Sequence, residues 1–129
     1  MVRKLFVIVL VSLAGCYVEN ARPARDYDRW WAATCGDVRP LGVGHDVTPP
    51  ILIERVEPRW PRDRERGVII VETVLTADGR VCAARIAKSA MSEVVSAAAL
   101  DAVRQWGFTP AKLGGEPRAA FYAVAVEVR

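Results

Sequence analysis

A predicted β-hairpin in the middle of the chain most limits what this sequence can fold into. The residues from Gly67 to Leu75 are almost all β-branched or apolar, which suits a strand with a buried face. Asp78 and Gly79 follow, and both tolerate the positive φ of a tight turn. The apolar pattern resumes from Val81 to Ile86 as a second strand. Two strands alone bury too little surface to be stable, so we expect a helix and a third strand.

The residues after the hairpin supply both elements. Ser92 suits a helix N-cap, and Gly107 is expected to end the helix. Apolar residues at helical spacing form one face, namely Val95, Ala98, Ala99, Ala102, Val103 and Trp106. The third strand is predicted over Ala119–Val128. Its better apolar face consists of Tyr122, Val124, Val126 and Val128.

A short helix is also expected before the hairpin. Pro61 suits the first turn of a helix that would run from Arg62 to Arg66 and end at Gly67. A second short helix is possible from Asp26 to Thr34. The predicted fold class is therefore α+β, with a three-stranded antiparallel sheet backed by one long and one short helix.

The N-terminus has the layout of an export signal. Arg3 and Lys4 precede an apolar run that is shorter than the roughly 20 residues of a spanning helix, although an uncleaved anchor is the alternative. Leu13-Ala14-Gly15-Cys16 resembles the lipobox of bacterial lipoproteins, in which the signal is cleaved before a Cys that receives a diacylglycerol.

The lipobox sets the expected domain organisation and location. Residues 1–15 are predicted to be a signal peptide, 16–49 a lipid-anchored connector, and 50–129 the folded domain. The protein would face the periplasm. By resemblance to lipoprotein sorting in enteric bacteria, Tyr17 in place of Asp after Cys16 favours the outer membrane over the inner membrane.

Acylation of Cys16 would leave Cys35 and Cys82 as the remaining cysteines. In an oxidising compartment such a pair tends to form a disulfide, whereas two buried free thiols are the alternative. The bond would hold Trp30 and Trp31 against the domain.

Charge and side-chain chemistry argue against several function classes. Removing Arg3 and Lys4 lowers the 18 basic residues to 16, against 15 acidic residues, so nucleic-acid binding is not expected. Serines and Cys82 are nucleophile types, but His45 is the only histidine and no serine lies in a glycine-flanked elbow. We therefore predict no enzyme, no metal site and no cofactor.

The second half of the chain resembles the C-terminal domain of the TonB family. The matching motifs, in order, are Pro58-x-Trp60-Pro61, Gly67, Asp78-Gly79-Arg80-Val81, Lys88-Ser89, Ala99-Leu100-x-x-Val103-x-x-Trp106-x-Phe108-x-Pro110 and Gly115-x-Pro117. Where the family usually has Tyr, this chain has Trp60. The resemblance covers about Pro50 to Arg129 and implies a helix-backed, three-stranded sheet.

The resemblance also implies a binding function. Energy transducers of this family grip a short peptide of outer-membrane transporters beside the last strand and the segment before the Tyr-Pro pair. Carried over by position, the partner-binding residues are Glu57, Arg59, Trp60, Tyr122, Val124, Val126 and Val128. Strand addition would use the backbone of the last strand, including the Val124 donor if it faces the partner. Self-association along the same edge is possible, and Trp60 could instead be a packing residue.

Two functions follow from the resemblance. The first is a lipid-anchored periplasmic module that recognises a peptide or protein edge by strand addition. The alternative is an energy-transducing partner in TonB-dependent transport across the outer membrane.

Overall fold

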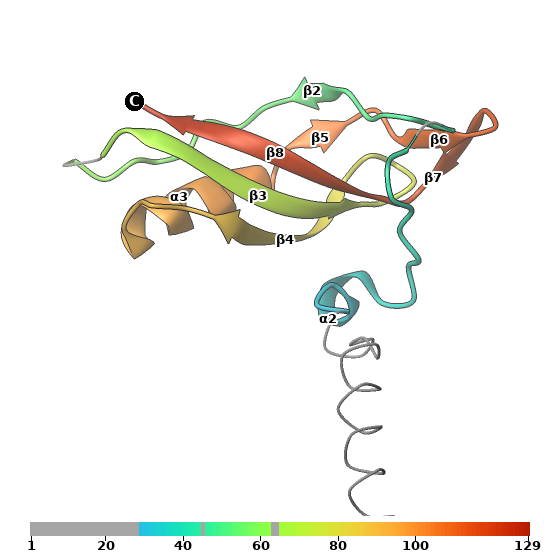
Figure 1. The fold of residues 1–129 in the computed structure, drawn as a ribbon, viewed down its shortest axis with the longest axis horizontal. Coiled ribbons are helices and arrows are strands. Elements are labelled where there is room, and N and C mark those ends of the chain that lie inside the picture. The colour runs from blue at the N-terminus through green and yellow to red at the C-terminus, as the bar shows by residue number, and fades with distance from the viewer. Residues whose placement is uncertain (1–28, 45, 63–64) are drawn as a thin grey trace, which may run out of the picture. The chain divides into compact units, whose positions relative to one another are not determined.

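The computed structural model describes residues 29–44, 46–62 and 65–129, and a three-stranded antiparallel sheet lies at the centre of the fold (Figure 1). Residues Trp31–Arg129 form one unit. The predicted leader, Cys16 and His45 lie outside the described residues. The helices and strands are α2 (Ala32–Cys35), β1 (Val47–Thr48), β2 (Leu52–Glu54), β3 (Gly67–Leu75), β4 (Val81–Lys88), α3 (Glu93–Val103), β5 (Gly107–Phe108), β6 (Ala111–Leu113), β7 (Glu116–Arg118) and β8 (Ala120–Val128).

The predicted hairpin is formed by β3 and β4. Its turn is closed by Thr76, whose backbone N–H donates to the carbonyl of Arg80 at 2.8 Å. The Thr76 hydroxyl accepts the N–H groups of Asp78 and Arg80, each at 3.2 Å. Gly79 has a φ of 85°, and a Cβ there would lie 1.8 Å from the carbonyl oxygen of Phe108. The turn therefore requires glycine both for its backbone angle and for the close approach of β5.

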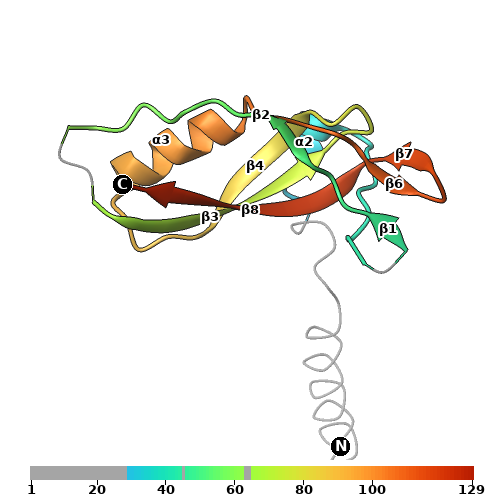
Figure 2. The ribbon, with the colours of Figure 1, turned by 90° about the horizontal axis from the view of Figure 1, so that it is seen from above.

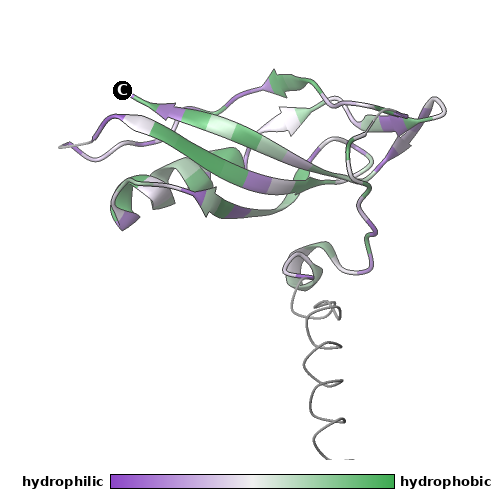
Figure 3. Cartoon of the chain, viewed as in Figure 1, coloured by the Kyte–Doolittle hydropathy of each residue, from purple (hydrophilic) through white to green (hydrophobic). Residues whose placement is uncertain are grey.

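The third predicted strand is confirmed as β8, which pairs with β3 along its whole length. Strand β3 lies between β4 and β8, so β8 is an edge strand of this sheet. The pairing is regular, with Val71 opposite Val124 and Gly67 opposite Val128. Apolar residues concentrate on β3 and β8 (Figure 3).

Helix α3 covers one face of the sheet and closes the core. Ser92 is its N-cap, as predicted, and its hydroxyl accepts the Val95 N–H at 3.4 Å. The cluster of buried apolar residues combines this helix with the sheet and β5, namely Ile69, Val71, Leu75, Val95, Ala99, Val103, Trp106, Phe108, Val126 and Val128. Figure 2 shows α3 beside the strands, with the described residues that follow β2 running along its far side.

Two details of the predicted helices are wrong. The helix ends at Val103 rather than near Gly107, because Gly107 begins β5 and pairs there with Glu54 of β2. No helix spans Arg62–Arg66, since Arg62 lies in a turn and Glu65 has no regular structure, while 63 and 64 lie outside the described residues. This segment is strongly charged and has no apolar face to bury.

The short helix of the described chain is α2, which overlaps the C-terminal end of the segment expected from Asp26 to Thr34 and extends one residue beyond it. Residues 26–28 of that segment lie outside the described residues. The sequence also did not predict the two small sheets, β1-β6-β7 and β2-β5. Their strands contain only two or three residues, too few for a period to be recognised. The overall α+β class, with a helix-backed three-stranded sheet, is confirmed.

Candidate partner-binding edge

Strand β8 has β3 on one side, and on its other, outer side the backbone N–H and C=O groups of every second residue point away from β3. The Phe121 N–H donates outward to the carbonyl of Leu41, and the Leu41 N–H donates to the carbonyl of Ala119, both at 2.9 Å. On the opposite side, the Tyr122 carbonyl accepts the hydroxyl of Thr73 of β3 at 2.6 Å. Backbone groups of successive strand residues alternate between the two sides of a strand. Odd-numbered residues of β8 therefore point their N–H and C=O groups outward.

Three outward-pointing residues of β8 lie beyond the pairing with Leu41, namely Ala123, Ala125 and Glu127. Within residues 29–44, 46–62 and 65–129, no strand pairs with this side of β8 after Ala120. The side chains of all three are exposed. The same alternation corrects the expected role of Val124, because its N–H points towards β3 and belongs to the internal ladder.

The side chains predicted to bind a partner from β8 face the core. Val126 and Val128 are fully buried, whereas Tyr122 and Val124 are half-buried at the margin of the core. The ring of Tyr122 packs edge-on against Phe108, with centroids 5.8 Å apart. Any partner at this edge therefore meets the β8 backbone first, and of the four side chains it can reach only the exposed parts of Tyr122 and Val124.

The residues from Val56 to Arg59 run beside α3 and do not form part of a sheet. The Trp106 indole N–H donates to the Val56 carbonyl at 2.8 Å, which fixes the segment against the end of the helix. The Arg55 guanidinium lies 5.1 Å from the centre of the Trp106 ring and 3.3 Å from a carboxylate oxygen of Glu57. These contacts hold the extended chain in place without a ladder.

Glu57 and Arg59 line a surface groove of about 600 Å³ between this segment and α3. Exposed Val94 and half-buried Ala98 of the helix contribute to its floor, and no residue of β8 lines it. Trp60 is half-buried and packs against the core. The structure thus places Glu57 and Arg59 in a groove beside the helix, whereas the predicted β8 side chains line the sheet side of the core.

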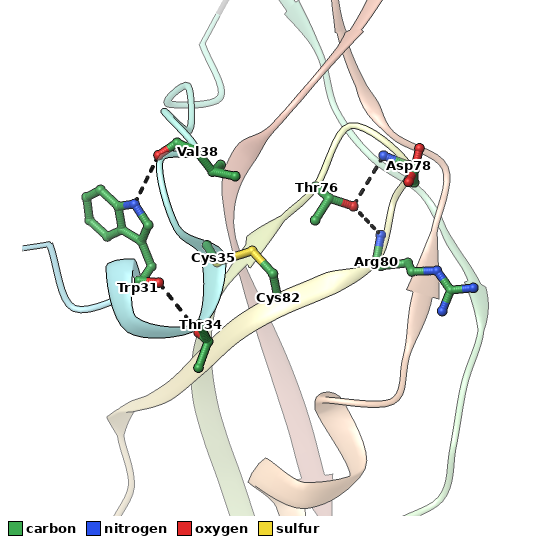
Figure 4. Close-up of a disulfide and its surroundings, with 8 residues drawn as sticks. All are labelled: Trp31, Thr34, Cys35, Val38, Thr76, Asp78, Arg80 and Cys82. Atoms are coloured by element: carbon green, nitrogen blue, oxygen red, sulfur yellow. Dashed lines mark hydrogen bonds between the residues drawn. A yellow bond between two sulfur atoms is a disulfide. The ribbon is translucent and has the colours of Figure 1, made fainter.

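The N-terminal part of the described chain is joined to the sheet by a disulfide between Cys35 and Cys82, the pair that the sequence predicts (Figure 4). It connects α2 to β4. The Trp31 indole N–H donates to the Val38 carbonyl at 3.2 Å, and its ring packs edge-on against Phe121 with centroids 5.1 Å apart. The disulfide and the aromatic contact hold this segment against the sheet.

The sequence that builds this edge is shared with a known protein family. The family described as "Gram-negative bacterial TonB protein C-terminal" matches residues 59–127, more than half of the chain. The chain belongs to the TonB C-terminal domain family. The matched range includes α3 and nearly all of the central sheet of this TonB domain, which confirms the resemblance inferred from the motifs.

One relative is a protein named "Protein TonB" from Vibrio cholerae serotype O1. It is 35% identical over 91 residues, and the match covers 61% of this chain. The match covers 37% of the Vibrio protein, so this chain spans less than two fifths of its length.

In the described part of the chain, no three His, Cys, Asp or Glu side chains converge in a way that could hold a metal ion. No helix within the same residues is long and apolar enough to cross a bilayer.

Sequence reasoning identified the last strand of the TonB domain but missed the groups that its edge presents. Leu41 lies in a Pro- and Gly-containing connector without periodicity, so nothing indicated that it pairs with β8. The outward direction of Ala123, Ala125 and Glu127 depends on which side of β8 its neighbouring strand occupies. Strand alternation could have suggested these three residues only once that neighbour was known.

Proposed function

We propose that this protein is a lipid-anchored, periplasm-facing TonB-family module that recognises an extended peptide or protein edge by strand addition along β8. The observation that carries the proposal is the row of outward backbone groups from Ala123 to Glu127, which no described strand occupies. An edge of this kind offers main-chain hydrogen bonds to any extended segment that lies beside it.

The composition of the edge favours docking. Edge strands that avoid partners commonly carry Pro, Lys or a bulge, but β8 contains neither residue and pairs with β3 without a register shift. Ala123 and Ala125 have small exposed side chains, so a second backbone can approach closely. The exposed parts of Tyr122 and Val124 on the helix side would favour apolar side chains at alternate positions of the partner.

The proposed location rests on the N-terminal sequence. The Leu13-Ala14-Gly15-Cys16 junction supports cleavage and acylation at Cys16, and Tyr17 favours the outer membrane. The proposed anchor would hold the domain at a membrane surface, where an extended segment of an outer-membrane protein is within reach. Protein partners of this kind agree with the family assignment.

A proline at Ala125 tests the docking edge directly. Ala125→Pro removes one outward N–H and leaves the β3–β8 ladder donors in place, whereas Ala125→Val changes the side chain but keeps the donor. A photoreactive amino acid at Ala123 in living cells reports the partner. We expect the wild type and Ala125→Val to give the same crosslinked products and Ala125→Pro to lose them. Circular dichroism and thermal unfolding check that each variant is folded.

Two outcomes would change this conclusion. If a folded Ala125→Pro variant still crosslinks the same products, β8 is not the docking edge. If the product is a dimer of this chain, the edge serves self-association rather than capture of another protein. The second outcome is recognised by the mass of the product and by its absence when the chain is dilute.

The similarity to the Vibrio protein named "Protein TonB" favours an energy-transducing partner in TonB-dependent transport as a second candidate function. The two functions differ in their dependence on the proton-motive force, because transduction requires a proton-driven motor. Crosslinking from Ala123 should change when the proton-motive force is collapsed if the protein transduces energy, and should stay the same if it only binds.

A further inference from the structure

The chain's own connector already occupies the first part of the β8 edge. Leu41 forms a parallel bridge with Ala120, in which its N–H and C=O both bond to β8 at 2.9 Å. The bonded groups are the carbonyl of Ala119, the residue immediately before β8, and the N–H of Phe121, the first outward-pointing residue of β8. An intramolecular segment thus makes the kind of contact that the proposed partner would make further along.

The bridge is supported by contacts on both sides of Leu41 in the sequence. Upstream, Cys35 is bonded to Cys82 of β4, with 5.3 Å between the Cα atoms. Trp31 packs on Phe121, the residue whose N–H bonds to Leu41. The Trp31 indole N–H also donates to the Val38 carbonyl (Figure 4). Downstream, β1 pairs with β6, with Val47 opposite Leu113. The segment around Leu41 is therefore held between two fixed points.

We propose that residues 38–41 act as a fixed stop on the docking edge, clamped by the Cys35–Cys82 disulfide. The inference rests on the proposed function, because it concerns where on β8 a partner can pair. With the Ala119 carbonyl and the Phe121 N–H occupied, the outward N–H groups of β8 that an incoming strand can bond are those of Ala123, Ala125 and Glu127. The stop thereby fixes the register of the partner and limits the paired stretch to about five residues, since outward groups recur at every second position.

A long apolar edge is a site for unselective pairing, and shortening it is one way in which proteins limit such pairing. The stop shortens the edge without changing β8 itself. It also places the Trp31–Phe121 contact next to the first open position. An extended segment that pairs with more than three outward-pointing residues of β8 would collide with the connector at Leu41, so only shorter pairings can form.

Amide hydrogen exchange of the full chain, resolved to single residues, tests the stop in the free protein. We expect the Phe121 amide to exchange at least about tenfold more slowly than those of Ala123 and Ala125, because of these three amides only Phe121 has an acceptor among the described residues. In a Cys35→Ser/Cys82→Ser variant this difference should disappear. The Val124 amide, which faces β3, is the internal control and should remain protected if the sheet stays folded.

A second variant keeps the test decisive if removal of the disulfide unfolds the domain. Leu41→Pro leaves the disulfide intact and removes the Leu41 N–H, one of the two hydrogen bonds of the bridge. With the Leu41–Ala119 bond lost, the remaining bond from the Phe121 N–H to the Leu41 carbonyl should weaken, and Phe121 should exchange faster. Rapid exchange of Phe121 in the wild type would overturn the proposal. So would a Phe121 amide that stays protected in both folded variants.

A synthetic peptide with the sequence of β8, Ala120–Val128, separates the stop from the docking function. In the wild type it should protect the amides of Ala123, Ala125 and Glu127, and in Cys35→Ser/Cys82→Ser its protection should extend to Phe121. Protection of none of the three amides would contradict the proposed function. Protection of all three that does not extend to Phe121 in the variant would contradict the stop alone.

Discussion

Trp60 and Trp106 show how two tryptophans of one domain differ in role. Trp106 is 4% exposed, and its indole N–H is bonded to Val56, so it is a core residue. Trp60 is half-buried against the same core, so part of this residue remains accessible to a partner. The alternative roles of Trp60, packing and partner contact, are therefore compatible with each other.

Substitution of Trp60 separates its two roles. Trp60→Ala should lower the free energy of unfolding by about 2 kcal/mol, and Trp106→Ala by about 4 kcal/mol, because truncation costs more where burial is complete. Urea unfolding measures both. If Trp60 also contacts the partner, Trp60→Ala should reduce crosslinking from Ala123 more than Trp106→Phe, a variant of comparable stability. A loss of about 4 kcal/mol in Trp60→Ala, together with crosslinking no lower than in Trp106→Phe, would identify Trp60 as purely structural.

Gly79 illustrates a different constraint, in which both backbone angle and space require glycine. Gly79→Ala should lower the free energy of unfolding by about 3 kcal/mol or more, since the Cβ would collide with the Phe108 carbonyl and φ is 85°. Gly114→Ala is the matched control, because φ is 60° there but no atom lies within 4 Å. We expect it to cost about 1 kcal/mol. Thermal or urea unfolding measures both variants. If Gly79→Ala and Gly114→Ala lose the same free energy of unfolding, β5 moves to relieve the contact with the Phe108 carbonyl.

At the scale of elements, the described fold depends on a covalent link between a short helix and an edge strand. Helix α2 has four residues, none of them buried, and would not form a stable helix by itself. The disulfide joins it to β4, and the aromatic pair of Trp31 and Phe121 joins it to β8. The connector is therefore part of the folded unit.

Removal of the disulfide should have a large effect on stability. The bond joins residues 47 positions apart, and closing a loop of that size contributes about 4 kcal/mol in the chain-entropy model. Cys35→Ser/Cys82→Ser should therefore unfold at a clearly lower urea concentration than the wild type. Ala33→Ser, an exposed change on α2, is the control and should behave like the wild type. An unchanged midpoint in the double variant would show that the connector contributes nothing to stability.

At the scale of the whole molecule, the proposed anchor determines where the docking edge operates. Acylation of Cys16 predicts that the intact mass of the native protein lacks residues 1–15 and carries an acyl adduct. Cys16→Ser should leave the membrane fraction, since the mature chain would lose its buried acyl chains. Cys35→Ser is the control because it should stay membrane-bound. A Cys16→Ser form that remains equally membrane-bound would contradict the lipoprotein prediction.

Local patterns in the sequence were sufficient for the central elements. The β-branched run of β3, the Asp78-Gly79 turn and the Ser92 cap each act over a few residues, so each could be recognised without tertiary contacts. The order of the motifs also identified the family. The cysteine count, together with the expected compartment, predicted the pairing of Cys35 with Cys82.

Tertiary contacts decided the features that carry the proposed function. The end of α3 is set by the pairing of Gly107 with β2. The direction of the β8 backbone groups depends on the position of β3, which made Ala125 rather than Val124 the outward donor. Leu41 meets β8 across about 80 residues of chain, and no short-range pattern in the sequence encodes a single long-range bridge.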